Sequence, residues 1–292
     1  MDTHAMLSKI LKATKPEEIF TQLDFKKEYL SYQKIFHPDV CHLPEANEAV
    51  KKLNSFRDQM EESNKIKDDA GTIEQATEKK LVFRGDKDLL LKSMENFQKL
   101  IRLNDDSAKH FRKYLPQAME YREETLYVFM EEKAVPVYNL TLPQEHITWF
   151  TSRMFEFTAW LHQVGYCHAG INPASVSIVP ETHGVVFTSF YHLQPLHSQL
   201  KTISAKYLDW YPDLVFKNKQ AIAYIDLNLV QRTALYVLGD KSGNGIRLKK
   251  DNNEFLIDFL ITPHYEAYKT FDEYRNLLRS LFGKPKFHKL EL

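Results

Sequence analysis

The stretch "YQKIFHPDVCH" at residues 32–42 places two side chains that could do chemistry, His37 and Asp39, on either side of Pro38. Proline lacks a backbone donor and disfavours helical backbone at the residue before it, so a preceding helix should end near Phe36. His37 and Asp39 are then presented on a loop. An exposed carboxylate beside a basic helix suits a partner that has a positive pocket inside an acidic surround.

Basic residues lie on the helix that leads into this loop. Lys26, Lys27 and Lys34 fall mostly away from its apolar face. That face consists of aromatic residues at helical spacing, Phe25, Tyr29, Tyr32 and Phe36. A second stripe follows the loop and consists of Val50, Leu53, Phe56 and Met60. The two patterns predict amphipathic helices that form an antiparallel hairpin within a helical region from residue 5 to residue 62.

The two helices and their loop resemble the J domain of DnaJ-type co-chaperones. The resemblance is carried by "DFKKEYLSYQKIFHPD" for the second helix and loop, and by "AVKKLNSFRDQM" for the third helix. In that family the loop and the basic helix engage a DnaK-type ATPase and accelerate its ATP hydrolysis. The resemblance implies a chaperone-binding surface made of His37, Pro38, Asp39, Lys26, Lys27 and Lys34. The alternative is a helix–loop–helix in which Pro38 and Asp39 only shape a turn.

Some features depart from the J-domain pattern. The first helix, expected around "EEIFTQ", is short and lacks the Tyr-Leu signature of the family. Glu28 and Leu30 dilute the basic face, which predicts weak binding or a restriction to one chaperone. Neither a glycine- and phenylalanine-rich region nor a cysteine-rich zinc module follows. A general client-binding protein of the DnaJ type is therefore not expected.

A second segment, "LHQVGYCHAGINPASVSIV" at residues 161–179, is similar to the catalytic segment of protein kinases. The matching residues are Leu161, His162, Gly165, His168, Ile171, Pro173 and Val176. The resemblance extends with less specificity over residues 81–288, where Lys92 takes the place of the strand lysine of the family. Asp226 takes the place of the acid that holds the backbone of the catalytic loop. The layout also resembles bacterial and phage chains in which a kinase-like domain follows a J domain.

The residues that perform phosphoryl transfer in kinases are missing from this second resemblance. Transfer needs an Asp that orients the hydroxyl group, and an Asn and an Asp that hold magnesium. Gly170, Ser175 and Ser189 take these three places. Without carboxylates a magnesium ion has no anionic anchor. The sequence therefore predicts a pseudokinase that is not an enzyme, with no cofactor and no metal site.

For several residues of this region, a structural role is an alternative to a functional one. Lys92 either lines a residual pocket or is a solvent-facing lysine of an apolar strand. His168 is expected in the core rather than as a base, and Asp226 is expected to accept backbone hydrogen bonds beneath the loop. Three further histidines are expected to be solvated loop residues, because their spacing is not that of metal ligands on one element: His183, His192 and His197.

The composition limits the partners and the compartment. Of the 292 residues, 43% are hydrophobic and 27% are charged, and the formal net charge is zero. This balance is typical of a globular protein and favours neither nucleic acid nor a membrane as a partner. With two cysteines, Cys41 and Cys167, neither a disulfide framework nor a four-ligand zinc site is available. The first residues lack the core of a signal peptide and no apolar run could span a bilayer, which predicts a cytoplasmic protein.

The expected fold class is α+β, with a small all-α J domain followed by a two-lobed kinase-like fold that has a reduced N-lobe. The expected boundaries are 1–62 for the J domain, 63–80 for a polar linker or solvated helix, 81–288 for the pseudokinase domain and 289–292 for a tail. Strands are expected at 80–85, 88–94, 125–132, 175–179 and 184–190, and long helices at 147–166, 223–239 and 271–283.

Together these features favour a co-chaperone that recruits and stimulates a DnaK-type ATPase, while the kinase-like domain binds a particular protein client. One alternative is a regulatory or structural component that binds a protein partner without stimulating the chaperone. A second alternative is a divergent kinase or nucleotidyl-transferase with substituted metal ligands. ATPase stimulation distinguishes the first function from the others, and magnesium-dependent ATP binding distinguishes the enzyme.

Overall fold

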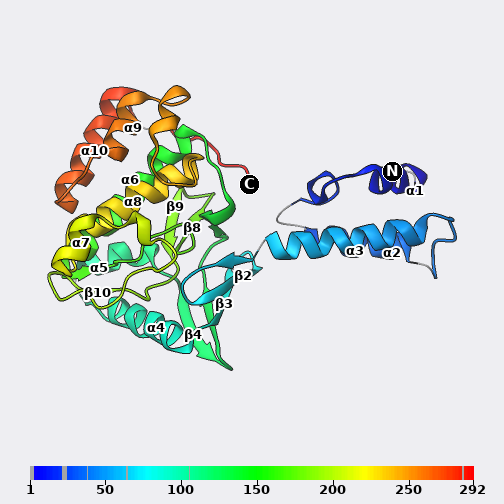
Figure 1. The fold of residues 1–292 in the computed structure, drawn as a ribbon, viewed down its shortest axis with the longest axis horizontal. Coiled ribbons are helices and arrows are strands. Elements are labelled where there is room, and N and C mark those ends of the chain that lie inside the picture. The colour runs from blue at the N-terminus through cyan, green and yellow to red at the C-terminus, as the bar shows by residue number, and fades with distance from the viewer. Residues whose placement is uncertain (1–2, 22–24, 38, 64, 105, 285) are drawn as a thin grey trace. The chain divides into compact units, whose positions relative to one another are not determined.

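The structure is a computed structural model that describes residues 3–21, 25–37, 39–63, 65–104, 106–284 and 286–292. The chain forms two compact units, Met1–Ile66 and Lys67–Leu292 (Figure 1). Helices build the first unit, and the second combines helices with β-sheets, so the chain has the mixed α and β character expected from its sequence. Each unit is described separately below.

The described part of the first unit contains α1 (Thr3–Lys12), the short 3₁₀ helix η1 (Pro16–Glu18), α2 (Phe25–Phe36) and α3 (Ala46–Ser63). Both α1 and α2 pack against α3. Their core includes aliphatic and aromatic side chains from all three helices, among them Leu7, Ile10, Phe25, Phe36, Leu53, Phe56 and Met60. These residues follow helical spacing, so the amphipathic stripes account for the packing.

The position of the first helix corrects the sequence-based prediction. The helix spans Thr3–Lys12, whereas the segment expected to be helical, around Glu17, contributes only the end of η1. Glu18 explains this short turn, because its Oε1 atom accepts hydrogen bonds from the backbone nitrogens of Thr14 and Lys15, both at 3.1 Å. A carboxylate that satisfies free backbone donors favours a helical start at this point and not further along the chain.

The hairpin of α2 and α3 confirms the prediction from the aromatic and aliphatic stripes. Phe25 and Phe36 are buried at the two ends of α2, and Tyr29 and Tyr32 pack against the same core. α2 ends at Phe36, as predicted from the following proline. Pro38 itself lies outside the described residues.

The second unit begins with a five-stranded sheet in the order β1-β2-β3-β5-β4. Its strands are β1 (Ile66–Lys67), β2 (Gly71–Thr77), β3 (Lys80–Gly85), β4 (Ala118–Arg122) and β5 (Thr125–Phe129). The pairs β2–β3, β3–β5 and β4–β5 are antiparallel. The helix α4 (Lys87–Ile101) packs on this sheet (Figure 1).

Two predictions for this region were wrong. The segment 88–94 belongs to the helix α4 and is not a strand, because Asp86 caps the helix by accepting a hydrogen bond from the backbone nitrogen of Leu89 at 2.9 Å. The segment 63–80 is not a linker over its whole length, since residues 66–67 and 71–77 form strands. Its polar residues occupy partly exposed positions of β2, where a solvent-facing strand tolerates them.

Helices dominate the rest of the second unit. They are α5 (Asp106–Phe111), α6 (Gln144–Gln163), α7 (Asp213–Asn218), α8 (Ala223–Leu238), α9 (Glu254–Ile261) and α10 (Ala267–Phe282), with the 3₁₀ helices η2 (Arg112–Tyr114), η3 (Val137–Asn139), η4 (Leu208–Trp210) and η5 (Ile246–Lys250). α6 packs against both α8 and α10. The predicted helices at 147–166, 223–239 and 271–283 correspond to these three.

Short strands connect the helices. β6 (Val135–Pro136), β8 (Val176–Val179) and β9 (Gly184–Phe187) form one small sheet, and β7 (Tyr166–Cys167) pairs with β10 (Gln194–Pro195). β8 and β9 lie within the strands predicted at 175–179 and 184–190. The predicted tail also has a place in this unit, because Leu290 is buried. Among the described residues, no helix has the length and apolar character needed to cross a bilayer.

Candidate functional site

His37 and Asp39 are both exposed at the end of α2, with 53% and 86% of their side-chain surfaces accessible. The His37 Nδ1 atom lies 3.4 Å from Asp39 Oδ2, and it accepts a hydrogen bond from the backbone nitrogen of Asp39 at 3.3 Å. The His37 carbonyl accepts hydrogen bonds from the backbone nitrogens of Val40 and Cys41, both at 2.9 Å. These bonds form a tight turn that leaves the Asp39 carboxylate accessible to a partner.

A polar network between the helices fixes the direction in which α2 approaches the loop. The Tyr29 hydroxyl donates to Asn54 Oδ1 of α3 at 2.7 Å. The same hydroxyl accepts hydrogen bonds from Gln33 at 3.0 Å and from Arg57 at 3.1 Å. Gln33 also donates to Asn54 at 2.9 Å. Because these side chains bridge α2 and α3, the loop that connects the two helices starts from a defined position.

The surface next to His37 combines charge with an apolar groove. Lys26, Lys27 and Lys34 are exposed on α2, as expected from their spacing. A groove of about 350 Å³ lies beside the loop and is lined by Leu30, Gln33, Lys34, His37 and Val40. Leu30 and Val40 are 58% and 65% exposed. This pair of exposed aliphatic side chains was not identified from the sequence, where Leu30 was considered only as a dilution of the basic face.

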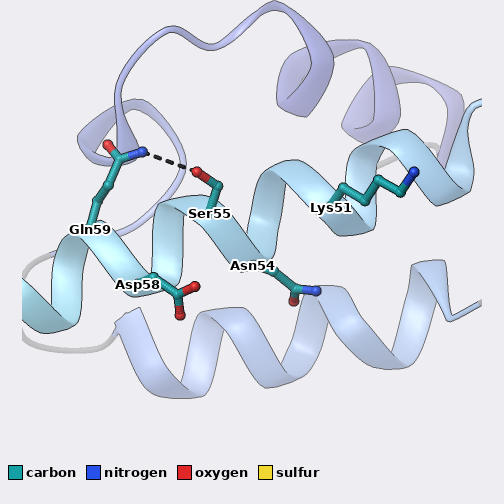
Figure 2. A pocket seen from close by; sticks show the side chains of 5 residues that line it. All are labelled: Lys51, Asn54, Ser55, Asp58 and Gln59. Carbon is teal, nitrogen blue, oxygen red and sulfur yellow. Dashed lines mark hydrogen bonds between the residues drawn. The ribbon is translucent and has the colours of Figure 1, made fainter.

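A second, open depression of about 620 Å³ lies on α3 and is lined by Lys51, Asn54, Ser55, Asp58 and Gln59. Figure 2 shows these polar side chains along one face of the helix, with Gln59 donating a hydrogen bond to the Ser55 hydroxyl at 3.2 Å. The lining provides neither a nucleophile beside a base nor a set of metal ligands. We therefore assign no chemistry to this depression.

In the second unit, Asp226 is buried and organises the loop that resembles a catalytic loop. Its two carboxylate oxygens accept hydrogen bonds from the backbone nitrogens of His168 and Ala169, both at 2.7 Å. The His162 Nε2 atom lies 2.8 Å from Asp226 Oδ2. Burial opposes ionisation, but these hydrogen bonds and the nearby histidines outweigh it and hold the pKa of Asp226 below its ordinary value. The predicted role of Asp226 as an acceptor beneath the loop is confirmed.

His162, Cys167 and Asp226 bring three possible ligand atoms within 4.8 Å of one another. A metal at this point would compete with the backbone donors that already occupy the Asp226 carboxylate. Burial and the neighbouring carboxylate raise the pKa of the Cys167 thiol well above its usual range, so the thiol stays protonated. The three side chains therefore form a structural hydrogen-bonding cluster.

His168 and the three residues that replace the catalytic and metal-binding side chains are buried and uncharged. His168 is fully enclosed, 5.7 Å from Phe187 and 5.5 Å from Phe190 between ring centroids. Burial lowers its pKa to about 4, so the imidazole is neutral at pH 7, which agrees with the expected core position. Gly170, Ser175 and Ser189 are also buried. A general base and an anionic metal ligand are thus missing from these positions.

Lys92 is not part of this buried cluster. It lies on α4 and not on a strand, and its side chain is 49% accessible. Its Nζ atom lies 3.6 Å from Glu95 Oε2, one helical turn away. Of the two interpretations of Lys92, the solvent-facing lysine is correct. The α4 residues that do reach the buried loop are Ser93, which accepts a hydrogen bond from the backbone nitrogen of Phe190 at 2.8 Å, and Asn96, which donates to the Phe190 carbonyl at 2.8 Å.

Two of the three histidines that were expected to be solvated are buried. His183 stacks on Trp149 with 4.4 Å between ring centroids, and its Nε2 atom lies 2.7 Å from the backbone carbonyl oxygen of His288. His192 is buried beside Asp69. Only His197 is exposed. Spacing along the sequence could not reveal these positions, because the partners of His183 and His192 come from distant segments.

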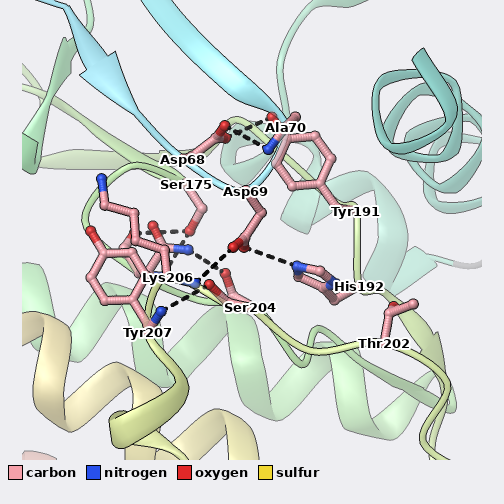
Figure 3. A network of polar contacts seen from close by, with 12 residues as sticks. Asp68, Asp69, Ala70, Ser175, Tyr191, His192, Thr202, Ser204, Lys206 and Tyr207 are labelled. Atoms are coloured by element: carbon pink, nitrogen blue, oxygen red, sulfur yellow. Dashed lines mark hydrogen bonds and ion pairs between the residues drawn. The ribbon is translucent and has the colours of Figure 1, made fainter. Parts of the chain in front are cut away.

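The sequence analysis also missed a pair of carboxylates, Asp68 and Asp69, at the turn between β1 and β2. Figure 3 shows this turn facing Tyr191 and His192. The Tyr191 hydroxyl donates to Asp68 Oδ2 at 2.7 Å, and His192 Nε2 donates to Asp69 Oδ2 at 3.1 Å. Because the segment 63–80 was expected to be a polar linker or a solvated helix, these acids were not considered as site residues. Two adjacent acids before a glycine were the available signal of a turn.

No protein-family model matches this sequence, and no curated protein is similar enough to be identified as a relative.

Proposed function

We propose that the chain is a co-chaperone whose first unit acts as a J domain and stimulates the ATPase of a DnaK-type chaperone. The observation that carries this proposal is the exposed pair of His37 and Asp39 at the end of a basic helix. The helix hairpin supports it, since α2 and α3 are antiparallel and share one core. The carboxylate of Asp39 would meet a basic pocket of the chaperone, while Lys26, Lys27 and Lys34 would meet acidic residues around that pocket.

The apolar groove beside the loop adds a contact that is not electrostatic. Leu30 and Val40 expose aliphatic carbon on both sides of Lys34 and His37. A partner that covers them gains the free energy of removing apolar surface from water. Charge would then guide the encounter, and the groove would prolong the complex.

For the second unit we propose a kinase-like fold without catalysis that binds a protein client. The succession of β3, α4, β4 and β5, followed by a helical part in which Asp226 holds a loop, supports the fold. The uncharged residues Gly170, Ser175 and Ser189 support the absence of phosphoryl transfer, because this chemistry depends on carboxylates and magnesium. Binding is a common use of such a scaffold. We place both functions in the cytoplasm.

The test of the J-domain proposal is the replacement of Asp39 by Asn in the full chain. We expect this variant to lose about tenfold or more in the stimulation of single-turnover ATP hydrolysis by a bacterial DnaK, because a charge-assisted contact is worth about 1.5–3 kcal/mol. The fold should be unaffected, since the side chain is exposed.

Asp58→Asn is the matched control, because it removes an exposed carboxylate from α3 of the same unit. The control should stimulate as well as the wild type. Equal stimulation by Asp39→Asn and Asp58→Asn would refute the J-domain proposal. If the wild type does not stimulate but still binds the chaperone, the chain is a docking component and not a stimulating co-chaperone.

A further inference from the structure

The turn between β1 and β2 reaches across the second unit to a loop more than a hundred residues away. Asp69 accepts a hydrogen bond from the backbone nitrogen of Lys206 at 3.0 Å through Oδ1, and from His192 at 3.1 Å through Oδ2. Its side chain is 7% accessible, and that of His192 is 4% accessible. One carboxylate thus holds two separate parts of the segment 192–206 (Figure 3).

The side chain of Lys206, which lies on the loop, also contacts the turn. Its Nζ atom donates to the backbone carbonyl of Lys67 and, at 3.1 Å, to the Tyr138 hydroxyl. The ammonium group also lies 4.6 Å from the centre of the Tyr138 ring. The loop and the turn therefore hold each other through both the backbone and the side chain of Lys206.

The turn is shaped for this contact by local bonds. Asp68 Oδ1 accepts hydrogen bonds from the backbone nitrogens of Ala70 and Gly71, both at 3.0 Å. The Ala70 carbonyl accepts a hydrogen bond from the backbone nitrogen of Asp86 at 2.6 Å. A Cβ atom on Gly85 would lie 1.8 Å from the Ala70 carbonyl oxygen, so only glycine allows this close approach.

On the opposite side, Gly170 makes room for the His192 ring. A Cβ atom at this position would lie 2.6 Å from His192 Cδ2. The position that resembles that of a catalytic acid is therefore covered by a histidine whose partner is a carboxylate from the turn. A side chain at residue 170 and the present place of His192 exclude each other.

We propose that Asp68, Asp69, Tyr191, His192 and Lys206 form a latch that makes the β1–β2 turn and the loop 191–207 open and close as one unit. This inference does not depend on the J-domain function. It predicts that a substitution that weakens the contacts of the turn also destabilises the loop, and the reverse, although the two are about 120 to 140 residues apart in sequence.

Amide hydrogen exchange of the full chain tests the latch. Asp69→Ala removes the acceptor of His192, of the Ser204 hydroxyl and of the Lys206 backbone nitrogen. We expect exchange to accelerate about tenfold at Ala70 and Gly71 on the turn, at Asp86, whose amide donates to the turn, and at Ser204 and Tyr207 on the loop. This acceleration corresponds to the loss of one charge-assisted hydrogen bond. Four of these amides donate to other acceptors: Asp86 to the Ala70 carbonyl, Ala70 and Gly71 to Asp68 Oδ1, and Ser204 to the Tyr211 hydroxyl. The fifth, Tyr207, donates to the Ser204 hydroxyl, which itself bonds to Asp69, so this amide reports the direct loss.

Two further variants keep the test decisive. Lys206→Met removes only the ammonium group of an exposed side chain, so it should fold and should accelerate the same five amides to a smaller extent. Asp106→Ala removes a fully exposed carboxylate of the same unit and should change none of them. Acceleration confined to the Lys206 and Tyr207 amides in Asp69→Ala, or to one side of the contact in Lys206→Met, would overturn the latch.

Discussion

Among the described residues, the carboxylates of Asp68, Asp69 and Asp226 are all shielded from solvent, but of these three only Asp68 has a raised pKa. Burial raises its pKa to about 6, although Tyr191 and two backbone nitrogens donate hydrogen bonds to it. The neighbouring Asp69 is also buried, but hydrogen bonds from His192, Ser204 and the backbone of Lys206 outweigh burial and lower its pKa. Two adjacent acids in one turn therefore have opposite pKa shifts, and they affect stability in opposite directions.

We predict that Asp68→Asn changes the pH dependence of stability. The pKa of Asp68 is about 6 in the folded protein and near 3.8 in an unfolded chain, so its contribution to stability falls as the pH rises from about 4 to about 6. Asn does not ionise, so the stability of the variant relative to the wild type should rise by about 2 kcal/mol across this range. Chemical unfolding followed by tryptophan fluorescence reports on this unit, because Trp149, Trp160 and Trp210 all lie in it.

The comparison between the two proteins isolates Asp68, since both retain Asp69 and Asp226. Asp106→Asn is the control at an exposed carboxylate and should follow the wild type at every pH. A constant difference between Asp68→Asn and the wild type from pH 4 to pH 7 would contradict the raised pKa.

Gly170 and His192 should be energetically coupled. Gly170→Ala places a methyl group 2.6 Å from His192 Cδ2, so we expect a loss of about 1–3 kcal/mol in unfolding free energy from overpacking. His192→Ala removes the ring and opens the space. In the His192→Ala background, Gly170→Ala should therefore cost at least about 1 kcal/mol less in unfolding free energy than it does in the wild type, as in other pairs of contacting residues. A double-mutant cycle by chemical unfolding measures this coupling, and additive effects would show that His192 does not occupy this place.

At the scale of elements, the hydroxyl of Tyr29 joins α2 to α3. We predict that Tyr29→Phe costs about 1–2 kcal/mol in local stability, because Asn54, Gln33 and Arg57 lose a shared partner. Amide exchange along α2 and α3 should accelerate accordingly. Tyr32→Phe makes the same chemical change one turn away on the same core and serves as the control. Equal exchange in both variants would mean that packing alone fixes the hairpin.

The elements differ in how far the sequence predicts them. α2, α3, α6, α8 and α10 follow from helical spacing of large apolar residues, and α2 ends at Phe36 because of the proline that follows. The segment 88–94 failed as a strand, since three consecutive leucines have no distinct period and the decisive signal was the cap at Asp86. β2 was missed because an exposed, polar strand is stabilised by its neighbour β3 and not by its own apolar residues.

The candidate sites also divide into residues whose positions the sequence predicts and residues whose positions it does not. The exposure of His37, Asp39 and the lysines of α2 follows from local rules, and so does the role of Asp226 once its resemblance is noted. The partners of His192 could not be predicted, because Asp69 is 123 residues away and nothing near either residue specifies the other. Long-range polar contacts depend on the fold that brings them together.

At the scale of the whole molecule, we predict that the two units can be separated. Each has its own core, so the fragment 65–292, which keeps β1 intact, should fold without residues 1–64, with a fluorescence spectrum and unfolding midpoint close to those of the full chain. Under the proposed division of function, the fragment 65–292 should also retain the client, while 1–64 should retain ATPase stimulation. Affinity capture with both fragments measures this division, and a client that follows 1–64 would contradict it.

The latch also has a consequence for the order of events during synthesis. Asp69 leaves the ribosome 137 residues before Lys206, so the turn exists as part of a growing chain long before its partner loop. Contacts between such distant residues form late, because closing a long loop costs conformational entropy before the contacts contribute favourable free energy. A nascent second unit therefore carries the Asp69 carboxylate before its partners His192 and Lys206 are made, while the helices of the first unit, whose contacts are local, can already be complete. The first unit can therefore finish folding before the loop and the turn of the second unit have met.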